Sequence, residues 1–546
     1  MTGFTGGDAV VEALRALGVD RVFVVASVHN LPILNALHRD GGIAVVNVRH
    51  EQAAVHGADG YARVTGRLGV AITSTGPGAA NAMGGLFEAG FASSPVLMLT
   101  GQVETGFYGK GRGYLHEAER QLEMLRSVTR QAWSVRRAAD IAEVVVAAGR
   151  EALTGRPQPT AVEIPVDLQY AETPRTGVVA APVPRAAPDP ARVAAAAALL
   201  AGARRPLVWA GGGVNHAGAA DALRAFVERL GIPVVTSTEG RGALPEDHPL
   251  CLGSLATYKP LRAHVERADA VLVVGSRFQM YPTGFWRLRL PPALVHLDAD
   301  PTVIGRSYPA RVALVADARD GLAALDAALP TGAVEPGWAD EGRAAADATV
   351  ARARERLGPD HRGIMDAIRR HLPRDGVVVR DSTVPAYVWG DSLLPILSSR
   401  TSLRPVSSAI GPGLPLAIGA AAGAGERTVV IHGDGGIMLT IGELSTLAQT
   451  GLPVTVCVFN DRGYGILRGI EAATFAGAQH DVDLATPDFA ALAEAMGVPA
   501  EKVSDAAGFE KAFAASVARP GPALIEVDLL ALAPMDYPIG GHENVA

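Results

Sequence analysis

Cysteine is scarce in this chain, because its 546 residues include only Cys251 and Cys457. Two thiols in so long a chain exclude a disulfide scaffold and indicate a reducing compartment. Cys457 stands within an apolar run, where a thiol is usually a small core residue. Stability must therefore come from buried cores, for which a hydrophobic content of 48% is ordinary.

The sequence also lacks the features of secreted, membrane-spanning and nucleic-acid-binding proteins. Residues 1–10 contain neither the basic nor the apolar region of a secretory signal. The alanine-rich run at residues 193–202 is too short to cross a bilayer. The net charge is −7, and the basic residues, far more arginine than lysine, are scattered along the chain. We expect a cytoplasmic protein without a membrane or nucleic-acid partner.

Two irregular segments divide the chain. Residues 173–190 are rich in proline and alanine and are typical of an extended linker, and residues 330–338 are also irregular. In each of the three resulting blocks, short apolar runs alternate with helical segments, which indicates parallel α/β sheets. The predicted fold class is therefore α/β, with three doubly wound parallel-sheet domains at residues 1–175, 190–330 and 360–546.

Two glycine-rich clusters follow apolar runs in the third block. Gly433-Asp434-Gly435 follows residues 428–431, and Asn460-Asp461-Arg462-Gly463-Tyr464-Gly465 follows residues 453–459. Each cluster lies where a predicted buried strand ends, which is where parallel α/β sheets bind ligands. Oxygen-bearing side chains beside glycines suit a hard cation held against a diphosphate. A lone Gly-Asp-Gly would indicate no more than a tight turn.

A second motif stands near the other end of the chain. Arg49-His50-Glu51-Gln52-Ala53-Ala54 follows a predicted strand at residues 43–48, and Glu51 opens a predicted helix. A carboxyl held in an apolar pocket has a raised pKa and can share a proton with a ligand. The alternative is a glutamate that is placed at a helix N-terminus because the helix dipole favours it.

These motifs resemble those of thiamine-diphosphate (ThDP) enzymes. The order of the blocks resembles the aminopyrimidine-binding, central and diphosphate-binding domains of the acetolactate synthase group, over essentially the whole chain. The resemblance implies that Glu51 hydrogen-bonds the N1′ atom of the aminopyrimidine and favours the 4′-imino form, whose nitrogen removes the proton from thiazolium C2. It also implies Mg²⁺, bound by Asp434, Asp461 and the carbonyl of Gly463. Asp461 departs from the family's asparagine and puts a second carboxylate on the ion.

The resemblance implies further cofactor contacts. Ile410 matches an apolar residue that bends the cofactor by wedging between its rings, and the carbonyl of Ser408 is the expected partner of the 4′-amino group. Ser382, with Thr383 beside it, offers a hydroxyl to the diphosphate. Ordinary core and turn roles are the alternatives. The other expected cofactor-binding residues are Thr75, Asn81, Gly433, Gly435, Gly436, Asn460, Tyr464 and Gly465.

Two histidines are candidate catalytic groups. His29 lies in the turn after the first apolar run, where several relatives place a polar residue that faces the cofactor, and it could relay a proton. His116 lies in Leu115-His116-Glu117, where acetolactate synthases carry Phe-Gln-Glu. Lone histidines are more often structural, so that alternative stays open for both.

The central block carries weaker signals. Gly211-Gly212-Gly213 with Gly218 is a glycine-rich turn that departs from the spacing of a dinucleotide fingerprint. The segments at residues 275–278 and 296–301 resemble the central domain of acetolactate synthases, which binds FAD. Because many relatives keep this domain without the flavin, the sequence leaves FAD open.

The expected substrate pocket departs from that of acetolactate synthases. Those enzymes carry Arg-Phe-Asp-Asp-Arg, whose last arginine recognises the carboxylate of a second 2-oxo acid, whereas this chain has Arg277-Phe278-Gln279-Met280-Tyr281. Their tryptophan beyond the Asn-Asn pair is also missing here. We expect a carboligase or decarboxylase, and hence a transferase or lyase, that acts on a 2-oxo acid with an altered acceptor pocket. The alternatives are a ThDP-dependent lyase or hydrolase acting on a 2-hydroxy ketone or diketone, and a catalytically inactive regulatory or binding subunit.

The two cofactor motifs stand in different domains. In the family these domains meet across a subunit interface, so the resemblance implies a homodimer or homotetramer with active sites between subunits. Residues 537–546 are a candidate for part of an active-site lid because of their position and glycines.

Overall fold

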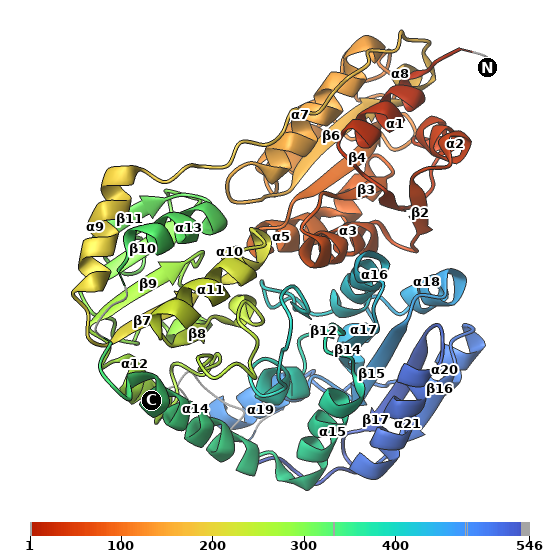
Figure 1. The fold of residues 1–546 in the computed structure, drawn as a ribbon. Coiled ribbons are helices and arrows are strands. Elements are labelled where there is room, and N and C mark those ends of the chain that lie inside the picture. Colours follow the sequence, from red (N-terminus) through yellow and green to blue (C-terminus); the bar gives the residue numbers. More distant parts are fainter. Residues whose placement is uncertain (1–2, 331–333, 476, 478, 537–546) are drawn as a thin grey trace.

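The computed structural model describes residues 3–330, 334–475, 477 and 479–536, so the expected lid segment lies outside the described residues. Three parallel sheets, each flanked by helices, follow one another along the chain (Figure 1). Within the described part of the chain, no helix is both long and apolar enough to cross a membrane.

The first domain is a six-stranded sheet in the order β2-β1-β3-β4-β6-β5. Its strands are β1 (Arg21–Val24), β2 (Ala44–Asn47), β3 (Gly69–Thr73), β4 (Val96–Gln102), β5 (Gln131–Ser134) and β6 (Thr160–Pro165). Its helices are α1 (Gly6–Ala16), α2 (Leu31–Asp40), α3 (Glu51–Thr65), α4 (Pro77–Asn81), α5 (Met83–Ala92), α6 (Gln121–Arg126), α7 (Ile141–Leu153) and α8 (Val166–Tyr170).

The second domain is a five-stranded sheet in the order β11-β10-β9-β7-β8. Its strands are β7 (Pro206–Ala210), β8 (Val234–Thr236), β9 (Ala270–Val274), β10 (Leu294–Asp298) and β11 (Val312–Val315). Its helices are α9 (Pro190–Ala201), α10 (Gly212–His216), α11 (Ala220–Leu230), α12 (Leu261–Val265) and α13 (Ala318–Ala328).

The third domain is a six-stranded sheet in the order β13-β12-β14-β15-β17-β16. Its strands are β12 (Val377–Arg380), β13 (Ser402–Leu403), β14 (Thr428–Gly433), β15 (Val454–Asn460), β16 (Ala500–Val503) and β17 (Ala523–Asp528). The helices in this part of the chain are α14 (Trp338–Glu355), α15 (Gly358–His371), α16 (Gly413–Ala424), α17 (Asp434–Ile437), α18 (Glu443–Thr450), α19 (Gly465–Thr474), α20 (Phe489–Ala495) and α21 (Ala506–Ala518).

The three sheets share one winding. In each, the second strand of the domain lies on one side of the first strand, and the third strand lies on its other side. The crevice beyond the carboxyl ends of the first and third strands is therefore the topological switch point, where doubly wound sheets bind ligands. The predicted fold class of three doubly wound α/β domains is confirmed.

Helices α3 and α16 join the first domain to the third (Figure 1). They approach so closely that a Cβ atom on Gly60 would lie 2.1 Å from the carbonyl oxygen of Leu416, and one on Gly419 would lie 1.9 Å from that of Gly57. Real Cβ atoms do not come so near a carbonyl, so glycine permits backbone-to-backbone contact here. This contact fixes the two domains relative to each other.

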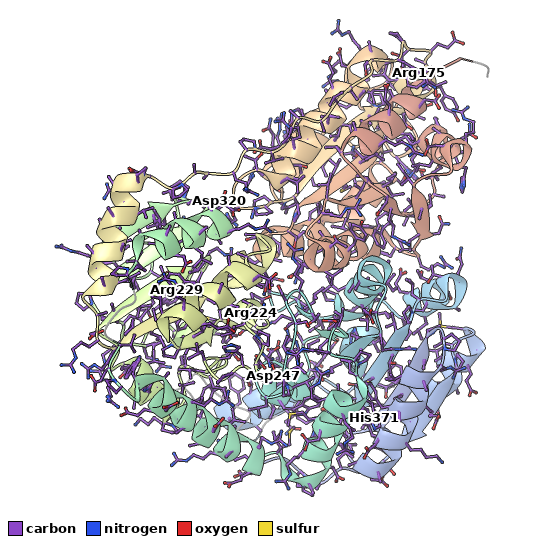
Figure 2. The ribbon with its side chains drawn as sticks, viewed as in Figure 1. Arg175, Arg224, Arg229, Asp247, Asp320 and His371 are labelled. Carbon is purple, nitrogen blue, oxygen red and sulfur yellow. The ribbon has the colours of Figure 1, made fainter. Side chains whose placement is uncertain are left out.

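The linker between the first and second domains is held at both ends. The guanidinium of Arg175 lies over the ring of Phe4, at 4.9 Å from the centroid. Farther along, Arg185 donates at 2.9 Å to Asp320 of α13, which is labelled in Figure 2. Both contacts are near the surface and each contributes little, about 1 kcal/mol or less. They fix the path of a segment that has no regular structure of its own.

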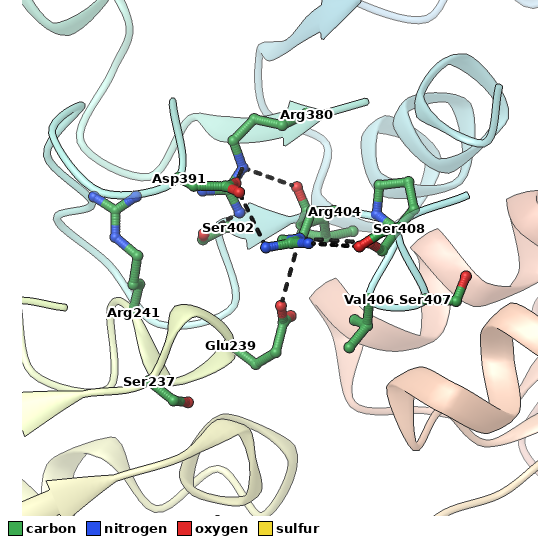
Figure 3. A network of polar contacts seen from close by, with 12 residues as sticks. Ser237, Glu239, Arg241, Arg380, Asp391, Ser402, Arg404, Val406, Ser407 and Ser408 are labelled. Atoms are coloured by element: carbon green, nitrogen blue, oxygen red, sulfur yellow. Dashed lines mark hydrogen bonds and ion pairs between the residues drawn. The ribbon is translucent and has the colours of Figure 1, made fainter. Parts of the chain in front are cut away.

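Buried ionic groups lie where the second and third domains meet (Figure 3). Arg404 donates to Asp391 at 3.0 Å and lies 3.9 Å from Glu239 of the second domain. Arg380 and Arg241 both donate to the carbonyl oxygen of Gly390, at 3.0 and 2.9 Å. Burial lowers the pKa of Arg380 to about 10, so its charge persists at neutral pH.

Candidate active site

The two glycine-rich motifs of the third domain lie side by side. Strands β14 and β15 are parallel neighbours with Gly433 opposite Phe459, so Asp434 and Asp461 follow adjacent strand ends. The buried Asp434 carboxylate accepts a hydrogen bond from the amide of Gly463 at 2.8 Å. Burial raises the pKa of Asp461, and the charge of Asp434 adds to the effect. The structure thus brings the three predicted metal-binding residues together.

The chemistry of this group suits a cation that completes its coordination with ligand oxygens. Among the described residues, no three or more His, Cys, Asp or Glu side chains are grouped to hold a metal. Asp434, Asp461 and a backbone carbonyl leave coordination positions open, which is how Mg²⁺ is usually held with substrate phosphates. The residues present therefore fit a metal–diphosphate group.

Glycines surround this group because their neighbours leave no room for side chains. A Cβ on Gly465 would lie 1.8 Å from a carboxylate oxygen of Asp461, and one on Gly435 would lie 2.6 Å from the ring of Tyr464. A Cβ on Gly433 would meet the Thr383 hydroxyl at 2.9 Å. These glycines therefore let the side chains of Asp461, Tyr464 and Thr383 pack directly on the backbone of the motif.

Asn460 faces away from the carboxylate pair. Its amide donates to the buried Glu526 of β17 at 2.9 Å, and its side-chain oxygen accepts from the amide of Arg462 at 3.1 Å. It therefore serves as a hydrogen-bonding group at the strand end.

Asp381, which sequence reasoning passed over in favour of Ser382, organises the loop that carries Ile410. Its carboxylate accepts from the amides of Gly411 at 3.0 Å and Gly413 at 2.7 Å. A Cβ on Gly436 would lie 2.8 Å from this carboxylate, so the loop also packs against the metal motif. An acidic residue directly after β12 was the only sequence signal for this role.

Ser382 supports the same loop. Its hydroxyl donates to the carbonyl oxygens of Ser408 at 3.2 Å and Ala409 at 3.0 Å. Ser408 has a φ of 64°, a strained conformation for a non-glycine residue. The Ile410 side chain is 37% exposed, so it is not ordinary core. An apolar residue presented from a strained, tethered loop is suited to contact a ligand.

Glu51 is the first residue of α3, as predicted, and it is buried, with 9% of the residue exposed. Asn81 donates to it at 3.0 Å. A Cβ on Gly78 would lie 2.7 Å from its other oxygen. The structure therefore brings Glu51 and Asn81 together. A glutamate placed at a helix N-terminus only by the helix dipole would be solvent-exposed, whereas Glu51 is buried.

Thr75, an expected cofactor-binding residue, has its hydroxyl directed into the first domain. Its hydroxyl donates to Gln121 at 2.8 Å, and Gln121 donates in turn to the fully buried Glu163 at 3.0 Å. Gln102 and Tyr108 also donate to Glu163, at 3.1 and 2.8 Å. This network holds the turn after β3 and was invisible in the sequence, because its members are far apart in the chain.

His29 and His116 form a pair beside that turn. Their ring centroids are 5.1 Å apart, and Ser74 lies 3.4 Å from Nδ1 of His116. Ser27, which follows β1, shares a 2.7 Å hydrogen bond with Ser74, which follows β3. Burial, and then the neighbouring His116, lower the pKa of His29. His29 is thus neutral at neutral pH and lies at the switch point of the first sheet.

A cavity lies at the switch point of the second sheet, against the first domain. Together with the open solvent at its mouth the cavity has a volume of about 1240 Å³, and Gly212, Gly275, Arg277 and Asp298 line it. The turns after β7 and β9 touch there, because the amide of Gly213 donates to the carbonyl of Gly275 at 2.9 Å. Burial raises the pKa of Asp298 to about 6.

The segment in place of the acetolactate synthase Arg-Phe-Asp-Asp-Arg runs from this cavity to the surface. Tyr281 and Trp286 are 57% and 51% exposed. Phe278, Phe285 and Trp286 all have positive φ, which non-glycine residues rarely adopt. Large exposed aromatic rings on a strained loop suit binding better than packing.

Comparison with known proteins identifies the family. The chain matches three thiamine pyrophosphate enzyme domains: the N-terminal TPP binding domain at residues 4–124, the central domain at residues 193–325 and the C-terminal TPP binding domain at residues 386–527. The protein therefore belongs to the thiamine pyrophosphate enzymes, and the sequence resemblance is confirmed.

Named relatives indicate which group of thiamine pyrophosphate enzymes this chain belongs to. A probable 2-ketoarginine decarboxylase of Pseudomonas aeruginosa is 35% identical, over 96% of this chain and 94% of the relative. A probable acetolactate synthase large subunit of Methanocaldococcus jannaschii is 31% identical, over 99% and 95%. The acetolactate synthase isozyme 3 large subunit of Escherichia coli is 32% identical, over 91% and 89%. This chain is a ThDP-dependent enzyme of the acetolactate synthase and 2-keto acid decarboxylase group.

Proposed function

We propose that this enzyme uses ThDP and Mg²⁺ to remove CO₂ from a 2-oxo acid, with carboligation to a second carbonyl compound as its other outcome. The observation that carries the proposal is the cluster of Asp434, Asp461 and the Gly463 backbone at adjacent strand ends of the third sheet. Bound ThDP supplies the carbon nucleophile and the electron sink for C–C cleavage. The residues of this chain bind it, orient it and move protons.

The residues divide these tasks. Asp434, Asp461 and the Gly463 carbonyl would hold the metal and diphosphate, and Ile410 would contact the rings. Glu51 would share a proton with the aminopyrimidine N1′ atom, and the 3.0 Å hydrogen bond from Asn81 fixes its carboxylate for that exchange. His29 is available as a proton acceptor because its lowered pKa keeps it neutral.

Decarboxylation is favoured over acetolactate formation by the Tyr281 position. A tyrosine cannot replace the bidentate hydrogen bonds and permanent charge that an arginine offers to the carboxylate of a second 2-oxo acid. A relative named as a probable decarboxylase of 2-ketoarginine agrees with a site that takes larger 2-oxo acids.

A substrate panel tests this proposal. We expect CO₂ release from at least one of pyruvate, benzoylformate and 2-ketoarginine in the presence of Mg²⁺ and ThDP, with little or no acetolactate from pyruvate. Mass spectrometry of the products distinguishes decarboxylation from ligation. Cleavage of benzoin without CO₂ release from any 2-oxo acid would favour the lyase alternative. Inactivity on the whole panel would favour the regulatory-subunit alternative.

Glu51→Gln should reduce kcat at least about 100-fold, because the amide cannot take up the proton. Calorimetry should show Mg²⁺–ThDP binding within about threefold of the wild type, since Gln preserves the hydrogen-bonding shape. Glu143, in the first turn of α7, is a matched control for a purely helix-capping glutamate. If Glu51→Gln and Glu143→Gln were equally active, the assigned role of Glu51 would be wrong.

We further propose that each active site joins the first domain of one chain to the third domain of another in a homodimer or homotetramer. A mixing experiment checks this. Glu51→Gln and Asp434→Asn chains should each be inactive, but coexpression in equal amounts should restore about a quarter of wild-type activity, because half the dimers contain one intact site. No recovery in verified mixed dimers would show that each site is formed within one chain.

FAD is the proposed occupant of the central cavity. The cavity lies at a topological switch point, its glycine turns allow close backbone approach, and Asp298 is the last residue of β10, where a carboxyl can accept from ribose hydroxyls. These residues fit a dinucleotide. The absorption spectrum of the purified protein should show a bound flavin, and a protein that remains colourless after incubation with FAD would rule it out.

A further inference from the structure

Arg468 of α19 contacts the loop between two of the predicted metal ligands, Asp461 and Gly463. Its Nη1 atom lies 3.4 Å from the Asp461 carboxylate, and its Nη2 atom lies 3.4 Å from the carbonyl oxygen of Asp461 and 3.5 Å from that of Arg462. On its other side it pairs with Asp483 at 2.8 Å. A Cβ on Gly463 would lie 2.5 Å from this guanidinium. No other group among the described residues forms an ion pair with Asp461.

The loop beneath Arg468 is tied down by further hydrogen bonds. Tyr464 donates from its amide to the carbonyl of Val482 at 2.8 Å, and Leu484 donates to the carbonyl of Arg462 at 2.9 Å. The amide of Gly463 is used by Asp434. The conformation of this loop therefore does not depend on Arg468 alone. The positive charge of Arg468 must have a role other than support of the backbone.

Two carboxylates at the predicted metal site create an electrostatic problem for an anionic cofactor. Asp434 is buried and the side chain of Asp461 is 12% exposed, so their like charges repel more strongly than in water. Two carboxylates would neutralise the charge of a bound Mg²⁺, so the ion would offer no net positive charge to a diphosphate. A cation adjacent to Asp461 offsets one of these charges.

We infer that Arg468 is a positioning residue that compensates the charge of Asp461, and so allows a carboxylate in place of the usual asparagine without loss of diphosphate affinity. The inference rests on the proposed Mg²⁺–ThDP site. Arg468 is a quarter exposed, so solvent weakens its effect but does not abolish it. It acts through Asp461 and is not assigned a contact with substrate.

If Arg468 acts through its charge, its substitution should change the affinities for ThDP and Mg²⁺ differently than if it only supports the loop. Arg468→Gln removes the charge and keeps an amide donor for the loop carbonyls. If charge matters, ThDP affinity at saturating Mg²⁺ falls about tenfold, whereas Mg²⁺ affinity without ThDP stays unchanged or increases, because the site becomes more negative. If Arg468 only supports the loop, both affinities fall together.

A double-mutant cycle provides the test, with titration calorimetry on metal-free and cofactor-free protein. Adding Asp461→Asn to Arg468→Gln should bring ThDP affinity back to within about threefold of the wild type, because the two losses of charge cancel. Arg468→Lys should also remain within about threefold, which keeps the test valid if the glutamine variant folds poorly. Arg462→Gln, at an exposed arginine of the same loop, is the matched control and should have a smaller effect.

The outcomes are distinguishable. An equal loss of ThDP affinity from Arg468→Gln in the wild-type and Asp461→Asn backgrounds would overturn the charge compensation, as would an equal loss from Arg462→Gln. Wild-type binding of Mg²⁺–ThDP without any coupling would refute this inference but leave the proposed function standing. Absence of Mg²⁺–ThDP binding by the wild type would refute both.

Discussion

The contact between helices α3 and α16 determines where the two halves of the candidate site can be. Both helices begin at site residues: α3 starts with Glu51, and α16 starts with Gly413, whose amide is held by Asp381. Because their backbones touch at glycines, neither helix can slide or rotate without a clash of main-chain atoms. Gly60 faces Leu416 and Gly57 faces Gly419, so the helices run antiparallel, and Glu51 and the Ile410 loop lie at opposite ends of one rigid pair. Within one chain the pair thus carries halves of two different sites, as the proposed pairing of chains requires.

Hydrogen bonds between the domains reinforce this arrangement. Glu88 of α5 accepts from the amides of Val406 and Ser407, at 2.7 and 3.0 Å, and Arg63 of α3 pairs with Glu88 at 2.9 Å. The loop that leads to Ile410 is thus fixed by the first domain as well as by Asp381. Buried charged groups are costly unless fully paired, so such a network favours one relative placement of the domains.

The interior of the fold could be predicted from the sequence because inner strands of parallel sheets are buried on both faces and read as continuous apolar runs. The strands absent from the sequence-based prediction were β5, β11, β13 and β16, and all four lie at sheet edges. Strands β5, β13 and β16 are partly exposed and polar or mixed in sequence, so no apolar run marks them. Strand β11 is the apolar run Val-Ala-Leu-Val, which the sequence-based prediction missed. The site motifs were predictable because they follow inner strands. Asp381, Arg468 and the Gln121–Glu163 network were not, since their roles depend on contacts between distant segments.

This chain contains far more arginine than lysine, and the junction of the second and third domains shows a physical reason for it. Burial brings the pKa of Arg380 down to about 10, and the guanidinium still carries its proton. The ordinary pKa of a lysine amine is about 10.4, so the same lowering by burial would bring that pKa to about 8. A lysine at position 380 would lose its charge in mildly alkaline solution, whereas the guanidinium of Arg380 keeps its charge across the physiological range.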